Sequence, residues 1–171
     1  MEVRLHRLQE SDAESLFHFE VENRSFFNKM VPDRGEDYYE FQTFNDKLLQ
    51  LITEQSLGLS TFYLVKDENG TIIGRINLVD FNYSNENVEL GYRISEDQSG
   101  KGMATLGVKR VLDEVYHQNK IKHISARTTK DNLASQEVLE SNGFTYISTD
   151  PEEVLLNGGK VNLMHYRWSK E

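Results

Sequence analysis

The sequence contains no cysteine, which excludes disulfide bonds, thiolate metal sites and a cysteine nucleophile. It has only two prolines and eleven glycines, which argues against a disordered or collagen-like chain. No stretch approaches the roughly 18 consecutive apolar residues of a membrane span. The first residues, MEVRLHRLQESDAE, also lack the apolar core of a signal peptide. We therefore expect a cytoplasmic protein with no membrane partner.

Positive charge is scarce as well. There are 19 lysines and arginines against 28 aspartates and glutamates, which gives a formal net charge of −9. A nucleic-acid binder usually presents a basic face, so this balance argues against a nucleic-acid partner and favours a cationic small molecule or a basic peptide. The histidines show no close ligand spacing, and we expect no metal site; they are His6, His18, His117, His123 and His165.

The residues that are present suit one folded domain spanning residues 1–171. Hydrophobic residues make up 37% of the chain and aromatic residues 11%, which is enough for a core at this length. Apolar residues alternate with polar ones in segments that we predict to be strands: 3–8, 60–65, 71–81, 87–94, 123–128, 145–149 and 160–168. An Asn69-Gly70 turn links the second and third of them.

Helical spacing predicts helices between these strands. One begins at Ser11, which we expect to be its N-cap with Glu14 completing a capping box. The others cover residues 38–52, residues 104–115 and a segment from Asn132 to Gly143. This succession predicts an α/β (α+β) fold: one mixed sheet with helices on both faces.

The segment between the first two helices, EVENRSFFNKMVPDRG (residues 20–35), is predicted to be a mobile substrate loop because it includes Pro32 and Gly35. Acidic residues gather in this region: Glu20, Glu22, Glu36, Asp37 and Glu40. They favour a solvated surface, with attraction of a cationic substrate as the alternative.

A glycine-rich segment, Ser99 to Ala104, separates a predicted strand from a predicted helix. Its glycines leave successive backbone N–H groups open, and the first N–H groups of the helix lack intrahelical partners. This combination binds phosphate, while a plain turn before an ordinary helix is the alternative. The spacing fits neither a Walker loop nor a dinucleotide fingerprint, because Gly102 follows Lys101 and Thr105 stands where a third glycine is needed.

With the later segment ARTTKDNLASQEVLESNGF, the chain resembles the GNAT family of N-acetyltransferases, and its RimJ/RimL-like branch in particular. The resemblance covers most of the chain and rests on these motifs: Glu89-Leu90-Gly91-Tyr92, Gly100 to Ala104, Asn132 with Ser135, Gly143-Phe144, and the Asn157-Gly158 turn. One departure is Ser99, which stands where many members carry Gln or Arg; Gln98 is adjacent but out of register.

The resemblance implies a GNAT fold: a central, mostly antiparallel mixed sheet with a splayed parallel pair at residues 87–94 and 123–128. Acetyl-CoA is the implied co-substrate, with its pantetheine arm along Tyr92, Arg93 and Ile94 and near Asn132. Its pyrophosphate is expected on Ser99, Gly100, Lys101, Gly102, Met103, Ala104 and Thr105. The resemblance leaves a monomer and a homodimer open.

The implied activity is transfer of acetyl from acetyl-CoA to a primary amine by direct attack. Glu89 is the implied general base and Ser135 the implied acid; the alternatives are a cross-strand ion pair for Glu89 and no chemistry for Ser135. The branch favours a protein N-terminal amine, such as that of a ribosomal protein. A small cationic amine (a polyamine or an aminoglycoside) and a non-catalytic acyl-CoA sensor remain alternatives.

Overall fold

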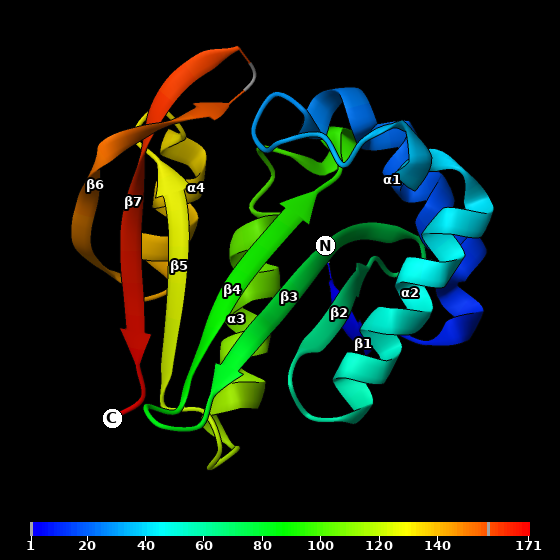
Figure 1. Cartoon of the computed structure of the whole chain (residues 1–171). Helices are drawn as coiled ribbons and strands as arrows, with labels where there is room; N and C mark the ends of the chain where they lie inside the picture. The colour runs from blue at the N-terminus through cyan, green and yellow to red at the C-terminus, as the bar shows by residue number, and fades with distance from the viewer. Residues whose placement is uncertain (1, 157) are drawn as a thin grey trace.

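The chain folds around one seven-stranded sheet in a computed structural model that describes residues 2–156 and 158–171. The strands lie in the order β1-β2-β3-β4-β5-β7-β6, and the β4–β5 pair is the one parallel pairing among the described strands (Figure 1). Their bounds are β1 Arg4–Arg7, β2 Thr61–Lys66, β3 Ile72–Asn82, β4 Asn87–Ile94, β5 His123–Thr129, β6 Thr145–Leu156 and β7 Gly159–Ser169. The mixed, mostly antiparallel sheet predicted from the sequence is confirmed.

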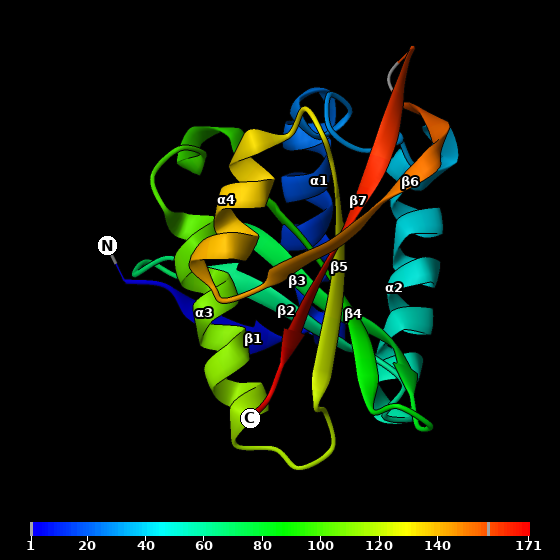
Figure 2. The same ribbon diagram turned by 90° about the vertical axis from the view of Figure 1, so that its left-hand side faces the viewer.

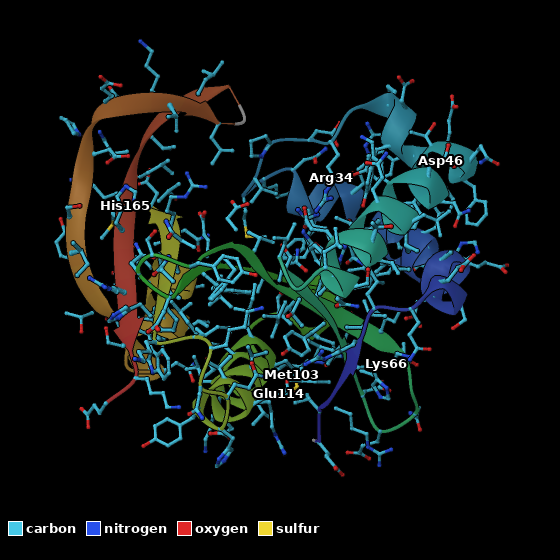
Figure 3. All side chains as sticks on the ribbon, turned by 60° about the horizontal axis from the view of Figure 1, so that its bottom comes forward. Arg34, Asp46, Lys66, Met103, Glu114 and His165 are labelled. Carbon is cyan, nitrogen blue, oxygen red and sulfur yellow. The ribbon has the colours of Figure 1, made fainter. Side chains whose placement is uncertain are left out.

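Helices cover both faces of this sheet, as predicted. Helices α3 (Met103–Tyr116) and α4 (Leu133–Ser141) lie on one face, and α1 (Ala13–Phe27) and α2 (Phe41–Ser56) lie on the other (Figure 2). In Figure 3, Met103 and Glu114 mark α3 and Asp46 marks α2 on opposite sides of the sheet. Two apolar cores result, one under each helix pair.

The two cores follow from sequence periodicity. Helix α3 buries Val108, Val111 and Val115, which recur at three- and four-residue intervals, against Ile76 and Ile124 of the sheet. On the opposite face, α1 and α2 bury a phenylalanine-rich layer that contains Leu16, Phe19, Phe27, Phe44 and Leu48. Each helix therefore packs by one stripe, and the sheet between them is apolar on both sides.

The parallel strands β4 and β5 stay paired over only part of their length. The ladder joins Asn87 to His123 and ends where Leu90 pairs with Ala126. Beyond that point the two ribbons diverge (Figure 1). The backbone of Gly91–Ile94 still pairs with β3 on its other side, so β4 continues as a strand with one open edge. The predicted splay of this pair is therefore present.

The start of α1 differs from prediction. Residues Glu10–Asp12 form a 3-10 turn, and the carboxylate of Asp12 accepts the N–H of Gln9 at 2.8 Å, so Ser11 is not the N-cap. The α-helix begins at Ala13. Asp12 stands three residues after Gln9 and its carboxylate makes the contact that was expected from Glu14 to Ser11, two residues earlier in the chain.

The end of α1 corrects a larger part of the prediction. The helix runs to Phe27, so the first half of the segment predicted to be a mobile loop is helical. Its buried stripe continues through Glu20 and Asn23, which are polar and therefore break the apolar periodicity that sequence reasoning follows. Likewise, residues 36–39 form a 3-10 turn and α2 begins at Phe41, three residues after the predicted start.

At the C-terminal end, β6 and β7 are 12 and 11 residues long, longer than predicted, and their pairing shifts register between Tyr146 and Ser148 and between Thr149 and Glu153. The hairpin turn expected at Asn157-Gly158 falls partly outside the described residues, since Asn157 is not among them. Gly158 has a φ of 78°, which favours glycine, and the register pairs Leu156 with Gly159 across the turn.

Candidate active site

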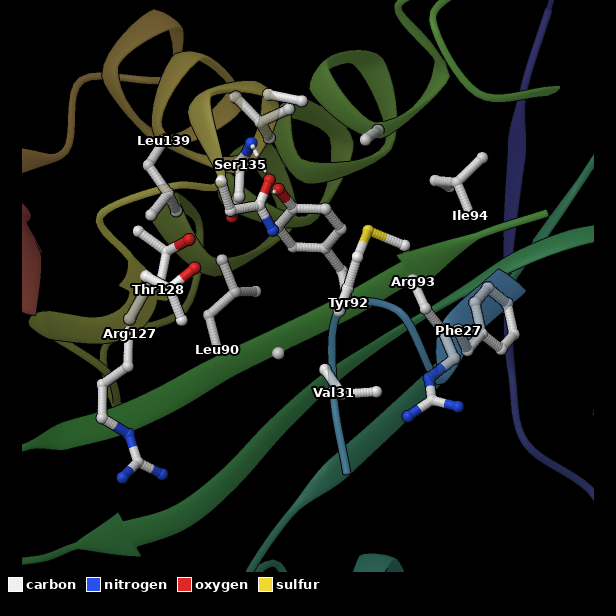
Figure 4. Close-up of a pocket in the computed structure, with 18 of the residues that line it drawn as sticks. Phe27, Val31, Leu90, Tyr92, Arg93, Ile94, Arg127, Thr128, Ser135 and Leu139 are labelled. Atoms are coloured by element: carbon white, nitrogen blue, oxygen red, sulfur yellow. Dashed lines mark hydrogen bonds between the residues drawn. The ribbon is translucent and has the colours of Figure 1, made fainter. Parts of the chain in front are cut away.

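A cavity of about 960 Å³ opens where β4 and β5 separate. It extends from the α3/α4 face of the sheet to the α1/α2 face, because its walls include Ser135 and Leu139 of α4 as well as Phe27 of α1. Figure 4 shows Tyr92 directed toward Ser135, while Arg93 is directed the other way, toward Phe27 and Val31. The cavity therefore has a half on each face of the sheet. We call them the helix-α3 half and the helix-α1 half.

The glycine loop forms one wall of the helix-α3 half. Gly100 and Gly102 have φ values of 73° and 78°, in the left-handed region that favours glycine, and a Cβ on either would meet no protein atom within 4 Å. Among the described residues, the N–H groups from Gly100 to Thr105 have no acceptor, and the first helical hydrogen bond is Leu106 N–H to Gly102 O. The loop thus offers unpaired donors and open space at a helix N-terminus, which suits a phosphate group.

All the site residues expected from the sequence line this cavity except Lys101, which is exposed beside it. Ser99 lines the wall, but its hydroxyl donates to Glu96 O at 2.9 Å. Met103, Ala104 and Thr105 face the cavity from the first turn of α3. The residues that carry the predicted site are therefore brought together from β4, the loop, α3 and α4.

Three buried polar atoms without a hydrogen-bond partner belong to residues of this cavity. Within the described residues they are Asn77 Oδ1, Gln98 Oε1 and Thr128 Oγ1, and all three side chains line this cavity. Leaving a buried polar atom unpaired costs about 1–3 kcal/mol, so such atoms are rare in folded proteins. All three atoms can therefore accept a hydrogen bond from a polar group or a water molecule that enters the cavity.

A chain of hydroxyl and amide groups crosses the helix-α3 half. Tyr92 Oη donates to Ser135 Oγ at 3.1 Å (Figure 4). The Ser135 N–H donates to Asn132 Oδ1 at 3.1 Å. Asn132 is thereby the N-cap of α4 through its side chain, so its amide NH₂ remains as its donor toward the cavity. Burial raises the pKa of Tyr92, which keeps its hydroxyl protonated near neutral pH.

Glu89 lies at the end of the paired part of β4. Its Oε1 accepts a hydrogen bond from Arg127 Nε at 2.7 Å, across the strand boundary to β5. The cross-strand ion pair that the sequence left as an alternative for Glu89 is therefore present. Both side chains line the cavity, and the carboxylate of Glu89 is partly exposed to it.

The helix-α1 half contains a buried ionic cluster that the sequence analysis missed. Glu20 has no exposed surface and accepts Arg75 Nη1 at 2.6 Å through Oε1 and Arg93 Nη1 at 3.2 Å through Oε2. Burial raises the pKa of Glu20, but attraction to Arg75 and Arg93 outweighs it and the net pKa is lowered. The expectation of a solvated Glu20 is therefore wrong, because α1 turns this residue into the core.

Arg34 and Tyr38 extend this cluster. Arg34 Nη1 and Arg75 Nη1 both donate to the Tyr38 hydroxyl, at 3.3 and 3.4 Å. The guanidinium of Arg93 stacks over the Phe27 ring with 4.7 Å to the centroid. Arg34, Arg75 and Arg93 all line the cavity, so its helix-α1 half is built around arginine side chains.

Sequence reasoning missed the Glu20–Arg75 pair because the two residues are far apart in the chain. Arg75 was visible as a lone charge in an apolar strand, IIGRINLV, and buried charges of that kind usually have a partner. Its partner Glu20 lies 55 residues earlier in the sequence, and no local pattern links them. Gln98 was set aside as out of register, yet its side chain reaches the cavity wall from the 3-10 turn before the loop.

Two further features bear on the kind of site. No group of three or more His, Asp or Glu side chains suited to hold a metal ion occurs in residues 2–156 and 158–171. In the same part of the chain, none of the helices combines the length and apolar character required to cross a bilayer.

Comparison with known proteins places the fold and site in a family. Residues 2–145 match the family described as an acetyltransferase (GNAT) domain. A curated relative, Probable N-acetyltransferase YjcK of Bacillus subtilis, is 29% identical over 158 residues, covering 88% of this chain and 84% of the relative.

Solved structures share the fold. A ribosomal-protein-S5-alanine acetyltransferase from Vibrio fischeri superposes with a TM-score of 0.93 at 20% identity, covering all of this chain and 94% of that one. A spermidine N-acetyltransferase from Vibrio cholerae, in complex with CoA and spermine, gives a TM-score of 0.83 at 19% identity and covers 98% of this chain and 95% of that one. With a split sheet, a glycine loop at a helix N-terminus and a family match over most of its length, the chain belongs to the GNAT family and is an acetyl-CoA-dependent N-acetyltransferase.

Proposed function

We propose that this enzyme acetylates the N-terminal amine of a protein, as one unit spanning residues 1–171. Acetyl-CoA, held in the helix-α3 half of the cavity, supplies the acetyl thioester, and the amine enters through the helix-α1 half. The observation that carries this proposal is the continuity of one cavity across both faces of the sheet at the point where β4 and β5 part.

The helix-α3 half fits the chemistry of CoA. The unpaired N–H groups from Gly100 to Thr105 suit its pyrophosphate, and Lys101 adds positive charge from the exposed side of the loop. Thr128, Gln98 and the NH₂ of Asn132 offer the hydrogen-bonding groups that the amides of a pantetheine arm need. The open edge of β4 at Tyr92, Arg93 and Ile94 gives further backbone groups for a strand-like ligand.

Glu89 is the proposed base. A lysine-like amine with a pKa near 10.4 costs about 4.6 kcal/mol to deprotonate at pH 7, whereas an α-amine near 7.8 costs about 1.1 kcal/mol. Glu89 Oε1 is held by Arg127, which fixes the carboxylate and leaves Oε2 for the amine proton, directly or through a water molecule. Asn77, which pairs with Gly91 across the β3–β4 ladder, has a buried Oδ1 available to an amine N–H.

Ser135 is the proposed donor to the departing sulfur. Because Tyr92 donates to Ser135 Oγ, the Ser135 hydroxyl proton is free to point into the cavity. A thiolate is a weak base, so a hydrogen bond from this hydroxyl suffices, and the Tyr92 hydrogen bond strengthens it. Backbone N–H groups on the open edge of β4 are the proposed donors to the thioester oxygen, a role worth about 3 kcal/mol in enzymes.

The charge of the helix-α1 half favours an N-terminal amine over a polyamine. The carboxylates in and behind this half are already paired, Glu89 with Arg127 and Glu20 with Arg75 and Arg93. A polyamine carries several cationic groups, and each would need a carboxylate partner that these contacts already occupy. An α-amine brings a single positive charge that is lost before reaction.

The proposal is tested by mixing the enzyme with acetyl-CoA and each of several amines: short peptides with free N-termini, the same peptides with blocked N-termini and an internal lysine, and spermidine. Release of free thiol measures turnover, and mass spectrometry locates the acetyl group. We expect acetylation of the α-amine of free peptides and at least tenfold slower turnover of spermidine.

A faster reaction with spermidine or with the internal lysine would reject the proposed acceptor while leaving the enzyme an acetyltransferase. Thiol release that is the same with and without every amine would instead reject amine transfer under these conditions.

A further inference from the structure

The helix-α1 half of the cavity carries positive charge in a strongly acidic protein. Arg34, Arg75 and Arg93 line it, and Glu20 is the carboxylate that pairs with two of them. Three positive charges against one negative charge leave a surplus of two on this wall, whereas the whole chain carries −9. The wall where the amine enters is therefore positive although the whole chain is negative. Such a wall attracts a negatively charged group on the substrate.

The nearby group of Asp33, Glu36 and Arg24 carries a net charge of −1, which is smaller than the surplus of two and lies outside the cavity lining. Asp33 and Glu36 are engaged by Arg24, at 2.8 and 3.1 Å, and neither lines the cavity. The hydrogen bond from Arg24 lowers the pKa of Asp33 to about 2, so this carboxylate stays ionised in its own pair. The surplus therefore belongs to the arginines of the cavity wall.

The surplus is carried by Arg34 and Arg93. Arg75 is buried and is satisfied by Glu20 at 2.6 Å. Arg34 is exposed to the cavity and, within residues 2–156 and 158–171, has no carboxylate within 4.0 Å, its one side-chain hydrogen bond being to Tyr38. Arg93 shares Glu20 with Arg75, so this one carboxylate serves two guanidinium groups.

The position of these arginines sets a distance from the reacting amine. Glu89, Gly91 and Arg93 lie on one face of β4, at alternate positions of the strand. Four residues of strand span about 13 Å, so Arg93 lies roughly that far along the strand from the proposed base. In an extended peptide whose α-amine is near Glu89, side chains of the second and third residues fall within this span.

We propose that the acceptor is an acidic N-terminal segment whose second or third residue carries a carboxylate that binds Arg34 and Arg93. This inference rests on the proposed N-terminal acceptor and narrows it. An arginine guanidinium matches a carboxylate with two parallel hydrogen bonds, which gives orientation as well as attraction. The same two cations repel a basic peptide or a polyamine, so the wall selects against cationic amines as well as for acidic ones.

The test uses peptides of one sequence that differ at the second residue, which is aspartate, asparagine or lysine. Initial rates of thiol release at subsaturating peptide give kcat/KM for each peptide with the wild-type enzyme. We expect the aspartate peptide to exceed the asparagine peptide about tenfold and the lysine peptide by more, with the advantage shrinking at high salt.

Two variants locate the effect. Arg34→Gln should reduce the aspartate-over-asparagine ratio to near one, because the variant loses the guanidinium that would bind the aspartate carboxylate. Arg24→Gln is the matched control: it removes the same charge from the same region, but Arg24 lies outside the cavity lining. It should leave the ratio unchanged.

Equal kcat/KM for the three peptides overturns the inference and leaves N-terminal acetylation standing. An equal loss of selectivity in Arg24→Gln and Arg34→Gln also overturns it, because the preference would then come from the general field and not from the cavity wall. Failure of every peptide, with turnover of spermidine, contradicts the proposed function itself and is distinguished by that result.

Discussion

The two halves of the cavity are built from different chemistry. The helix-α3 half presents backbone N–H groups, hydroxyls and amides: the Gly100 to Thr105 loop, the Tyr92–Ser135 pair and Asn132. The helix-α1 half presents charged side chains held in ion pairs, in which buried Glu20 pairs with Arg75 and Arg93. The strands β4 and β5 divide these halves at Leu90 and Ala126.

In the proposed function, this difference corresponds to the two ligands, CoA in the helix-α3 half and the amine in the helix-α1 half. CoA is the same molecule for every member of the family, and main-chain donors at a helix N-terminus recognise its phosphates whatever the side chains are. The amine differs among acetyltransferases, and side chains set that choice. Helix α1 also contacts the turn before the glycine loop, because Asn23 Oδ1 accepts the N–H of Glu96 at 3.0 Å.

The largest effect is expected from breaking the buried ion pair between Glu20 and Arg75 in the helix-α1 half. Glu20→Gln leaves Arg75 buried without its charge partner, so we expect the free energy of unfolding to fall by about 3–5 kcal/mol. Urea denaturation monitored by circular dichroism measures this change. Glu22→Gln, an exposed position on the same helix, is the control and should change stability by less than about 0.5 kcal/mol.

The same pair predicts a dependence on pH. Because the folded pKa of Glu20 lies below its ordinary value, the stability it contributes is present above the unfolded pKa and is lost as pH falls through the folded pKa. The stability gap between wild type and Glu20→Gln should therefore be widest near neutral pH and narrow in acid. A gap that stays constant down to the acid unfolding transition would remove the ion pair as its cause.

The next effect concerns Glu89, the proposed general base on the same face of β4 as Arg93. Glu89→Gln should lower kcat at pH 7 about a hundredfold and leave CoA affinity unchanged, because the carboxylate acts on the amine. Turnover should recover as pH rises, since the amine then loses its proton to solvent. Glu86→Gln, outside the cavity lining, is the control. A pH profile of Glu89→Gln parallel to that of the wild type would assign Glu89 to the ion pair with Arg127 alone.

A smaller effect, on CoA affinity, tests whether the glycine loop binds phosphate. Gly102→Ala places a Cβ at a φ of 78° beside the unpaired N–H groups, and we expect CoA affinity to fall roughly tenfold through strain and obstruction. Gly70→Ala imposes the same kind of strain, at a φ of 81°, in the β2–β3 turn. It should lower stability only. Isothermal titration measures the CoA affinity of both variants. Equal affinities would contradict a phosphate-binding role for the Gly100 to Thr105 loop.

The smallest effect tests the hydroxyl pair. Tyr92→Phe removes the hydrogen bond to Ser135 Oγ, so kcat should fall about fivefold, in keeping with one hydrogen bond of roughly 1 kcal/mol. Tyr116→Phe, at an exposed position of α3, should have no effect on kcat. If Ser135→Ala and Tyr92→Phe both keep full kcat, the pair does not assist the departing sulfur.

The sequence predicted the helix-α3 half better than the helix-α1 half for a physical reason. A strand end, two glycines and a helix start lie within a dozen residues, so local backbone chemistry is enough to predict the loop. The splayed pair and the open edge at Tyr92 to Ile94 came from the family resemblance, and the strand ladder confirms the splay. The Tyr92–Ser135 contact joins residues 43 apart and could not be predicted from either motif.

The helix-α1 half depends on pairing at long range. Glu20 looks like a surface residue in the sequence because its partners, Arg75 and Arg93, are 55 and 73 residues away. In the fold, α1 packs against the sheet, so the Glu20 carboxylate is buried and pairs with one arginine of β3 and one of β4. Local patterns give the identity of such residues, and only tertiary packing gives their partners.

The central claim is that one cavity, opened by the parting of β4 and β5, holds CoA on one side of the sheet and the amine on the other. A crystal structure of the complex with CoA tests it most directly. We predict pyrophosphate oxygens within hydrogen-bond distance of N–H groups between Gly100 and Thr105, and the thiol close to the Ser135 hydroxyl. Density for CoA at any other place, with this cavity empty, would contradict the account.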